Sequence, residues 1–228
     1  MKYEVAIFDL DGTLIDTIED LGTAVNHTLR LRSLPLHSME EYKGMVGHGI
    51  RDLVTKALPI SLQEDSSYID SALKDFREYY SSHIDVHTRP YEGMVALLEE
   101  LHSAGVRIAV ASNKFQEGTE RLIREFFPRV EFIAIFGNRE GYPLKPDPAI
   151  VKEVLSRAGA DSSKAVMVGD SRTDIRTAVA GGIDIIAVSW GFRPEEELSQ
   201  ALTELSPAGR LAGSVAQLRE FLYGGEKK

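Results

Sequence analysis

The chain has 228 residues and contains no cysteine. Disulfide bridges, thiolate nucleophiles and zinc sites built on thiolates are therefore excluded from its fold and its chemistry. Long apolar runs are missing too, since no uninterrupted run exceeds five residues. A membrane-spanning helix needs about 20 apolar residues and the core of a signal peptide about 7 to 15, so the sequence predicts neither. From these missing signals alone, we expect a cytoplasmic protein with no membrane partner.

The chain also has fewer basic residues than acidic ones. The chain has 26 Lys and Arg against 35 Asp and Glu, a formal net charge of −9. An acidic surface repels nucleic acid, so we expect no nucleic-acid partner, and a site for an anion must hold its positive charge locally. Hydrophobic residues make up 43% of the chain and charged residues 27%, which is typical of a folded soluble protein and excludes a disordered chain.

Apolar runs alternate with amphipathic segments in most of the chain. This alternation predicts βαβ units, and hence an α/β fold with a doubly wound, Rossmann-like parallel sheet. The predicted strands are 3–8, 106–111, 132–135, 165–168 and 183–188, and the predicted helices of this part are 94–104, 117–126, 147–158, 173–180 and 214–222. Residues 224–228 are expected to fray.

A stretch with helix signals only follows the first strand. It predicts a small all-helical insertion at residues 16–82, which interrupts an α/β core domain formed by residues 1–15 and 83–228. The signals are apolar residues at helical spacing from Ile18 to Leu29, capping boxes at 38–41 and 61–64, and a helical pattern at 50–57 after the loop 47–49.

Polar side chains follow four of the predicted strands, at the edge where a doubly wound sheet binds its ligands. Several carboxylates at one edge repel each other unless a cation joins them, and oxygen ligands in a phosphate-handling site suit Mg²⁺. A lysine and a hydroxyl suit a phosphoryl group, which one of the carboxylates could attack to form an acyl phosphate. The residues are Asp9 and Asp11, then Ser112, Asn113 and Lys114, then Lys145, and finally Asp170 and Asp174.

Four segments carry a resemblance to a known family. FDLDGTLID (8–16), ASNK (111–114), LKPDP (144–148) and VGDSRTD (168–174) resemble, in order and spacing, the four motifs of haloacid dehalogenase-like hydrolases. The resemblance spans nearly the whole chain, and the insertion after the first motif looks like the small helical cap domain of that family. The most similar subgroup is phosphoglycolate phosphatase-like.

The resemblance implies catalytic roles for three residues. Asp9 would be the nucleophile and a Mg²⁺ ligand. Asp11 would be the general acid for the leaving alcohol and then the general base for water, and its backbone carbonyl would bind the metal. Lys145 would neutralise charge on Asp9 and on the phosphoryl group.

The resemblance implies binding roles for five more residues. Ser112 and the backbone of Asn113 would hold the phosphoryl oxygens, and Gly12 would let the backbone turn tightly beside the phosphate. Asp170 would bind the metal. Asp174 would support the metal directly or through water, or would simply cap the following helix.

The insertion offers candidates for binding the rest of the substrate. Similarity to phosphoglycolate phosphatases points to a two-carbon phosphate that ends in a carboxylate. Arg51 lies at a helix start behind a glycine-flanked loop and suits a carboxylate, so we expect it to bind this end, although a solvated arginine in a turn is the alternative. His48 and Lys43 are weaker candidates, and Lys114 is expected at the surface.

These inferences favour a Mg²⁺-dependent phosphomonoesterase that hydrolyses a small phosphorylated metabolite through an aspartyl phosphate. A pyrophosphatase of the same superfamily stays open as an alternative. A sugar phosphomutase is disfavoured, because such enzymes carry a histidine where this chain has Leu21, and a dehalogenase would lack the second acid, Asp11. A receiver-type phosphoacceptor module uses similar residues but is much shorter and lacks the insertion. The oligomeric state, monomer or homodimer, stays open.

Overall fold

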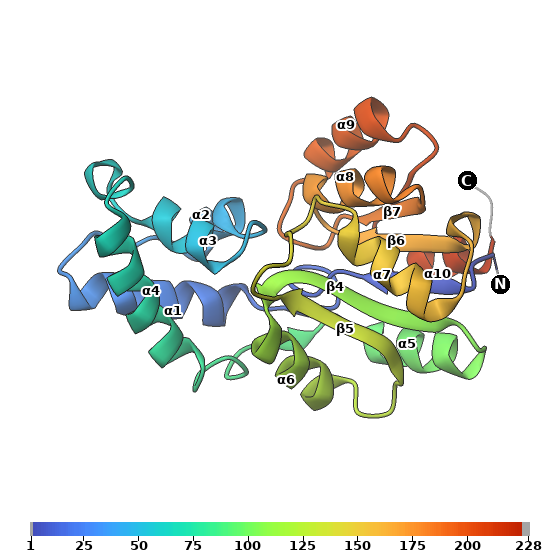
Figure 1. Cartoon of the computed structure of the whole chain (residues 1–228), viewed down its shortest axis with the longest axis horizontal. Helices are drawn as coiled ribbons and strands as arrows, with labels where there is room; N and C mark the ends of the chain where they lie inside the picture. The colour runs from blue at the N-terminus through green and yellow to red at the C-terminus, as the bar shows by residue number, and fades with distance from the viewer. Residues whose placement is uncertain (1, 225–228) are drawn as a thin grey trace.

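The centre of the molecule is a six-stranded sheet in the order β5-β4-β1-β6-β7-β8, in which every neighbouring pair is parallel (Figure 1). The computed structural model describes residues 2–224. The strands are β1 (Val5–Phe8), β4 (Arg107–Phe115), β5 (Phe132–Asn138), β6 (Ala165–Gly169), β7 (Asp184–Val188) and β8 (Arg210–Ala212). The chain winds outward in both directions from β1, so the predicted doubly wound α/β fold is confirmed.

Helices cover both faces of the sheet. In β1, Ala6 and Phe8 face one hydrophobic core, formed with α5 (Met94–Ser103), α6 (Gln116–Phe126) and α10 (Val215–Tyr223). Val5 and Ile7 face the other core, formed with α7 (Ala149–Ala158), α8 (Arg172–Gly181) and α9 (Glu195–Leu205). This division follows from the two-residue period of a strand, which sends successive side chains to opposite faces.

Two elements of the core escaped the sequence analysis. Strand β8 has only three residues, and α9 begins with three glutamates and buries only Leu198, Ala201 and Leu202. Such a short strand and such a narrow apolar stripe give weak periodic signals. Within residues 2–224, no helix combines the length and the hydropathy that a bilayer span requires. The expected fraying concerns residues beyond Gly224, which lie outside the described part of the chain.

The predicted helical insertion is observed as four helices packed on one another at one side of the sheet (Figure 1). They are α1 (Ile18–Leu31), α2 (Met39–Met45), α3 (Ile50–Ala57) and α4 (Ser66–Tyr80). The capping box of Ser38 and Glu41 is present at the start of α2. The expected helix start at Ser61 is wrong: residues 60–62 form a 3₁₀ turn, and α4 starts after Asp65, whose carboxylate accepts from Tyr68 N.

Two chain crossings join the insertion to the sheet. They pair as short antiparallel strands, β2 (Ile15–Asp16) and β3 (Arg89–Pro90). The buried carboxylate of Asp20 in α1 accepts hydrogen bonds from the backbone N–H groups of His87 and Thr88, and from the Thr88 hydroxyl. The second crossing is thereby fixed to the first helix of the insertion.

Replacing Asp20 with alanine should lower the free energy of unfolding by about 1–3 kcal/mol, because donors of His87 and Thr88 would be left without their acceptor. Urea denaturation of the variant would measure this loss. The neighbouring Glu19 is exposed, so Glu19→Ala is the matched control and should stay within about 0.5 kcal/mol of the wild type. Equal losses in the two variants would contradict the proposed anchor.

Candidate active site

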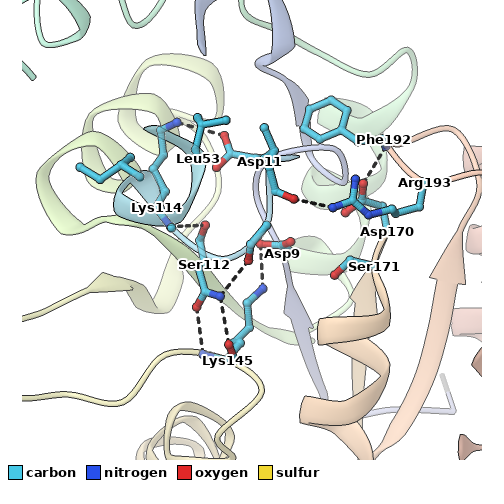
Figure 2. Close-up of a pocket in the computed structure, with 15 residues that line it drawn as sticks. Asp9, Asp11, Leu53, Ser112, Lys114, Lys145, Asp170, Ser171, Phe192 and Arg193 are labelled. Carbon is cyan, nitrogen blue, oxygen red and sulfur yellow. Dashed lines mark hydrogen bonds and ion pairs between the residues drawn. The ribbon is translucent and has the colours of Figure 1, made fainter. Parts of the chain in front are cut away.

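The carboxyl ends of β1, β4 and β6 meet at one small cavity (Figure 2). Its free volume is about 40 Å³, several times the roughly 10–15 Å³ that one water molecule needs by the same measure. A phosphoryl-sized group is therefore comparable in size to this space. The cavity is lined by Asp9, Asp11, Ser112, Asn113, Lys114, Lys145, Asp170, Ser171, Phe192 and Arg193 of the core, and by Val46, Gly47, Gly49, Ile50 and Leu53 of the insertion.

Two of three clustered, buried carboxylates pair with one lysine. The Lys145 ammonium lies 2.9 Å from Asp9 Oδ1 and 2.7 Å from Asp174 Oδ1. One oxygen each of Asp9, Asp170 and Asp174 can be chosen so that all three lie within 4.8 Å of one another. A single ammonium therefore pairs with two members of a cluster of three acidic groups.

Burial and mutual repulsion shift the acidity of these groups. Burial raises the pKa of Asp9 well above its ordinary value, and the charges of Asp174 and Asp170 add to this effect against the opposing charge of Lys145. Burial, followed by the charge of Asp174, raises the pKa of Asp170 to about 7. Burial would lower the pKa of Lys145, but the charges of Asp174 and Asp9 raise it above its ordinary value. Because the carboxylates repel each other when ionised, their oxygens suit a divalent cation.

Both carboxylate oxygens of Asp174 already accept from protein donors. Its Oδ1 accepts from Lys145, and its Oδ2 accepts from the backbone N–H of Ser171 at 3.1 Å and from the Ser171 hydroxyl at 2.6 Å. Ser171 in turn caps α8 through the backbone N–H of Asp174. These contacts favour a supporting role for Asp174 over direct binding of a metal.

Asp11 has a different set of partners. Its Oδ1 accepts from the Thr17 hydroxyl at 2.7 Å and from the Lys114 ammonium at 3.0 Å. Lys114 also donates to the Tyr80 hydroxyl at 2.7 Å. Since Thr17 caps the first helix of the insertion and Tyr80 ends the last, both ends of the insertion contact the Asp11 network.

The expectation that Lys114 lies at the surface is wrong. Lys114 is only 4% exposed, because its ammonium pairs with Asp11. The predicted strand ended at residue 111, so its period did not place Lys114 on a face, whereas β4 continues to Phe115 in the structure. The Ser112 hydroxyl accepts from the backbone N–H of Lys114 at 3.1 Å.

The Asn113 carboxamide joins two loops of the site. Its Oδ1 accepts from Lys145 N at 2.9 Å, and its Nδ2 donates to Lys145 O at 3.1 Å and to Gly47 O at 2.9 Å. The side chain of Asn113 therefore holds the backbone of the lysine loop and one carbonyl of the insertion.

Gly12 approaches Asp170 more closely than any other residue type could. Its φ is 83°, and a Cβ at this position would lie 2.3 Å from Asp170 Oδ2. Gly12 does not line the cavity itself. Because Gly12 has no side chain, the turn after β1 can lie directly against the Asp170 carboxylate.

Arg51 does not reach the cavity, contrary to expectation. Ile50 and Leu53 of α3 share the buried face that lines the cavity, whereas Arg51 lies one residue, about 100°, around the helix. Its side chain is 54% exposed and pairs with Asp70 of α4. His48 and Lys43 do not line this cavity either.

Comparison with known proteins decides the family. A family model described as haloacid dehalogenase-like hydrolase matches residues 6–188. The chain belongs to the haloacid dehalogenase-like hydrolases. Its order of strand-end motifs and its parallel sheet agree with that membership.

Three proteins similar to this hydrolase are named phosphoglycolate phosphatase. It is 36% identical over 193 residues to a phosphoglycolate phosphatase of Mesorhizobium japonicum, a match covering 84% of this chain and 85% of the relative. It is 32% identical over 230 residues to a phosphoglycolate phosphatase of Neisseria meningitidis, covering 99% and 96%. A crystal structure from Lactobacillus delbrueckii subsp. bulgaricus, provisionally named phosphoglycolate phosphatase, superposes with a TM-score of 0.89 at 31% identity and covers 98% of this chain and 100% of that one. This hydrolase is a phosphatase of the phosphoglycolate phosphatase-like group.

The raised pKa of Asp170 generates a prediction for protein stripped of divalent cations with EDTA. The folded state holds a proton on Asp170 up to a pH of about 7, whereas the unfolded state releases it near 3.8, so stability falls as the pH rises between these values. Asp170→Asn removes the buried charge and should raise Tm at pH 7.5 by at least about 2 °C, with a smaller gain at pH 5. Asp147→Asn, at an exposed position, is the control and should show no such trend. An equal gain at both pH values would contradict the assigned charge conflict.

Proposed function

We propose that this phosphatase is a Mg²⁺-dependent phosphomonoesterase that hydrolyses a small ester, 2-phosphoglycolate above others, through an aspartyl-phosphate intermediate. The observation that carries the proposal is the contact of Asp9 with Lys145 at 2.9 Å, at the end of β1 and beside Asp170. The names of the relatives support the choice of substrate, and the small cavity agrees with a small phosphorylated metabolite.

Asp9 supplies the nucleophile in this scheme. Leu10 N and the Lys145 ammonium both bind Oδ1, which leaves Oδ2 to attack phosphorus. The new bond joins Oδ2 to phosphorus, and the bond between phosphorus and the alcohol oxygen breaks. Lys145 offsets the negative charge that gathers as the phosphoryl group approaches the carboxylate. The Ser112 hydroxyl and the backbone of Asn113 hold phosphoryl oxygens.

Asp11 moves the protons. Thr17 and Lys114 hold Oδ1 in place, so Oδ2 is the oxygen left to deliver a proton to the departing alkoxide. The same carboxylate then takes a proton from a water whose oxygen bonds to phosphorus, while the bond between phosphorus and Asp9 Oδ2 breaks and inorganic phosphate leaves. Each turnover thus returns Asp9 and Asp11 to their starting states.

The acidic cluster has the donors that Mg²⁺ prefers. Asp9, the backbone carbonyl of Asp11 and Asp170 would hold the ion, and Asp174 would support them through Lys145 and Ser171. When bound, Mg²⁺ would supply positive charge that lets the nucleophile and the phosphoryl group approach each other.

We propose further that residues 16–82 are a cap domain over a core of residues 1–15 and 83–228. Val46, Ile50 and Leu53 of the insertion line the cavity opposite the acidic cluster, so the leaving group would face them. Polymeric phosphates should therefore be poor substrates. The position that carries the histidine of sugar phosphomutases is Leu21, which is buried among apolar residues and offers no proton donor.

A panel of phosphate esters tests the substrate. With Mg²⁺ present, kcat/KM for 2-phosphoglycolate should exceed the values for sugar phosphates, nucleotides and pyrophosphate at least about tenfold, which corresponds to about 1.4 kcal/mol of transition-state binding. EDTA should stop hydrolysis and added Mg²⁺ should restore it. Preference for pyrophosphate would favour the pyrophosphatase alternative, and activity that persists through thorough chelation would remove the metal from the scheme.

Substitution of the two acids tests the covalent scheme. Asp9→Asn should abolish turnover, because an amide is a poor nucleophile. Asp11→Asn should lower kcat by about 10²–10⁴, the usual contribution of a general acid and base. Quenching Asp11→Asn with acid during turnover and measuring protein-bound phosphate that hydroxylamine releases would detect the intermediate. Near-normal turnover by Asp9→Asn would rule out the aspartyl phosphate.

A further inference from the structure

Two side chains of the sheet domain bind three backbone carbonyls of the insertion. Arg193, between β7 and α9, donates from Nη1 to Lys43 O and from Nη2 to Val46 O. Asn113 donates from Nδ2 to Gly47 O at 2.9 Å. These bonds join the core to the C-terminal end of α2 and the loop that follows it.

The carbonyls involved explain why an arginine suits this place. Lys43 and Val46 lie at the C-terminal end of α2, where the last carbonyls of a helix have no partner within the helix. The same end carries the negative pole of the helix dipole, which favours a cation. The planar guanidinium of Arg193 presents two parallel donors and therefore caps α2 from the opposite side of the site.

Arg193 is held in place on the core side. Its side chain is only 13% exposed, and its Nε lies 4.0 Å from Glu197 in α9. The preceding residue, Phe192, donates its backbone N–H to Asp170 Oδ2 at 2.7 Å, and Figure 2 labels these neighbours together. The contact with the insertion thus begins one residue away from a carboxylate of the acidic cluster.

Arg193 also lies between two cavities. One is the reaction cavity of about 40 Å³, and the other is a larger cavity of about 690 Å³ between the insertion and α8. Lys43, Arg172, Arg176 and Arg193 line the larger cavity, and Glu40 and Glu197 line it too. Four cationic side chains against two acidic ones leave this lining with an excess of positive charge, which in a chain with a net charge of −9 offers an anionic ester a favourable approach.

We propose that Arg193 is a positioning residue for the reaction. With Asn113 it forms a latch that holds residues 43–47 over the acidic cluster, and this latch opens to admit an ester from the cationic cavity and to release products. The proposal rests on the proposed function only for the identity of the ligand, a phosphate ester, that enters the cavity. The latch itself is a contact between two parts of the chain.

The absence of cysteine allows a direct test. Glu64 in the insertion and Glu196 in α9 are both exposed, so Glu64→Cys and Glu196→Cys would carry spin labels for distance measurement without substrate. The protein with native Arg193 should give mainly one short distance. Adding Arg193→Ala should increase the longer-distance population roughly tenfold, the effect expected for the loss of charge-assisted hydrogen bonds.

Two further variants separate the latch from charge and from folding. Arg193→Lys keeps a positive charge near Asp170 but cannot bridge two carbonyls as a fork, so it should give an intermediate population. Arg219 pairs with Glu100 on the far side of the core, and Arg219→Ala should leave the distances unchanged. In kinetics on 2-phosphoglycolate, kcat/KM should fall with the closed population and recover partly in Arg193→Lys.

The outcomes of the two proposals are distinguishable. Wild-type distances in both Arg193→Ala and Arg193→Lys would overturn the latch, whatever their activity. An altered distance distribution in a protein that hydrolyses no phosphate ester would support the latch and overturn the proposed function instead. If Arg193→Ala does not fold, as circular dichroism would reveal, the distances of Arg193→Lys decide the question alone.

Discussion

The site depends on one buried electrostatic arrangement, the Lys145 ammonium between the carboxylates of Asp9 and Asp174. Charges leave water at a high energetic cost, and attraction offsets this cost only where the geometry is good and the remaining donors and acceptors are bound. The chain meets this demand by joining three segments: the end of β1, the loop before α7 and the start of α8. Asn113 holds the backbone of Lys145 from both sides, and Ser171 occupies the second oxygen of Asp174.

The insertion and the chemistry are physically connected at two places. Asp11 is bound by Thr17 and Lys114, and Lys114 by Tyr80, so residues from both ends of the insertion reach the proposed acid and base. On the opposite wall, Arg193 binds carbonyls at the end of α2. A movement of the insertion would therefore disturb the environment of Asp11, the proposed acid and base, and the wall of the cavity together. The proposed latch and the proposed acid and base thus belong to one network of contacts.

Features that depend on neighbouring residues were easier to predict from the sequence than contacts between residues far apart in the chain. The capping box at Ser38 and the apolar run of β1 are local properties, and both predictions are confirmed. Lys114 looked like a surface residue because its partner, Asp11, lies 103 positions away in the chain. Arg51 looked like a ligand because the glycine loop before it suggested a binding site, yet the rotation of α3 directs Ile50 and Leu53 to the cavity and Arg51 toward Asp70.

Residue patterns alone predict the α/β alternation, the helical insertion after the first strand and the set of acids, hydroxyl and lysine at the strand ends. These features can be predicted because hydrophobic periodicity and the residues at strand ends are properties of short segments of the chain. The folded chain shows what these patterns do not: Lys145 and Ser171 bind both oxygens of Asp174, and Arg193 binds the insertion. Those assignments depend on which side chains meet across the fold. Segments far apart in the chain come together there, and burial and competition for hydrogen-bond partners decide which of their side chains pair.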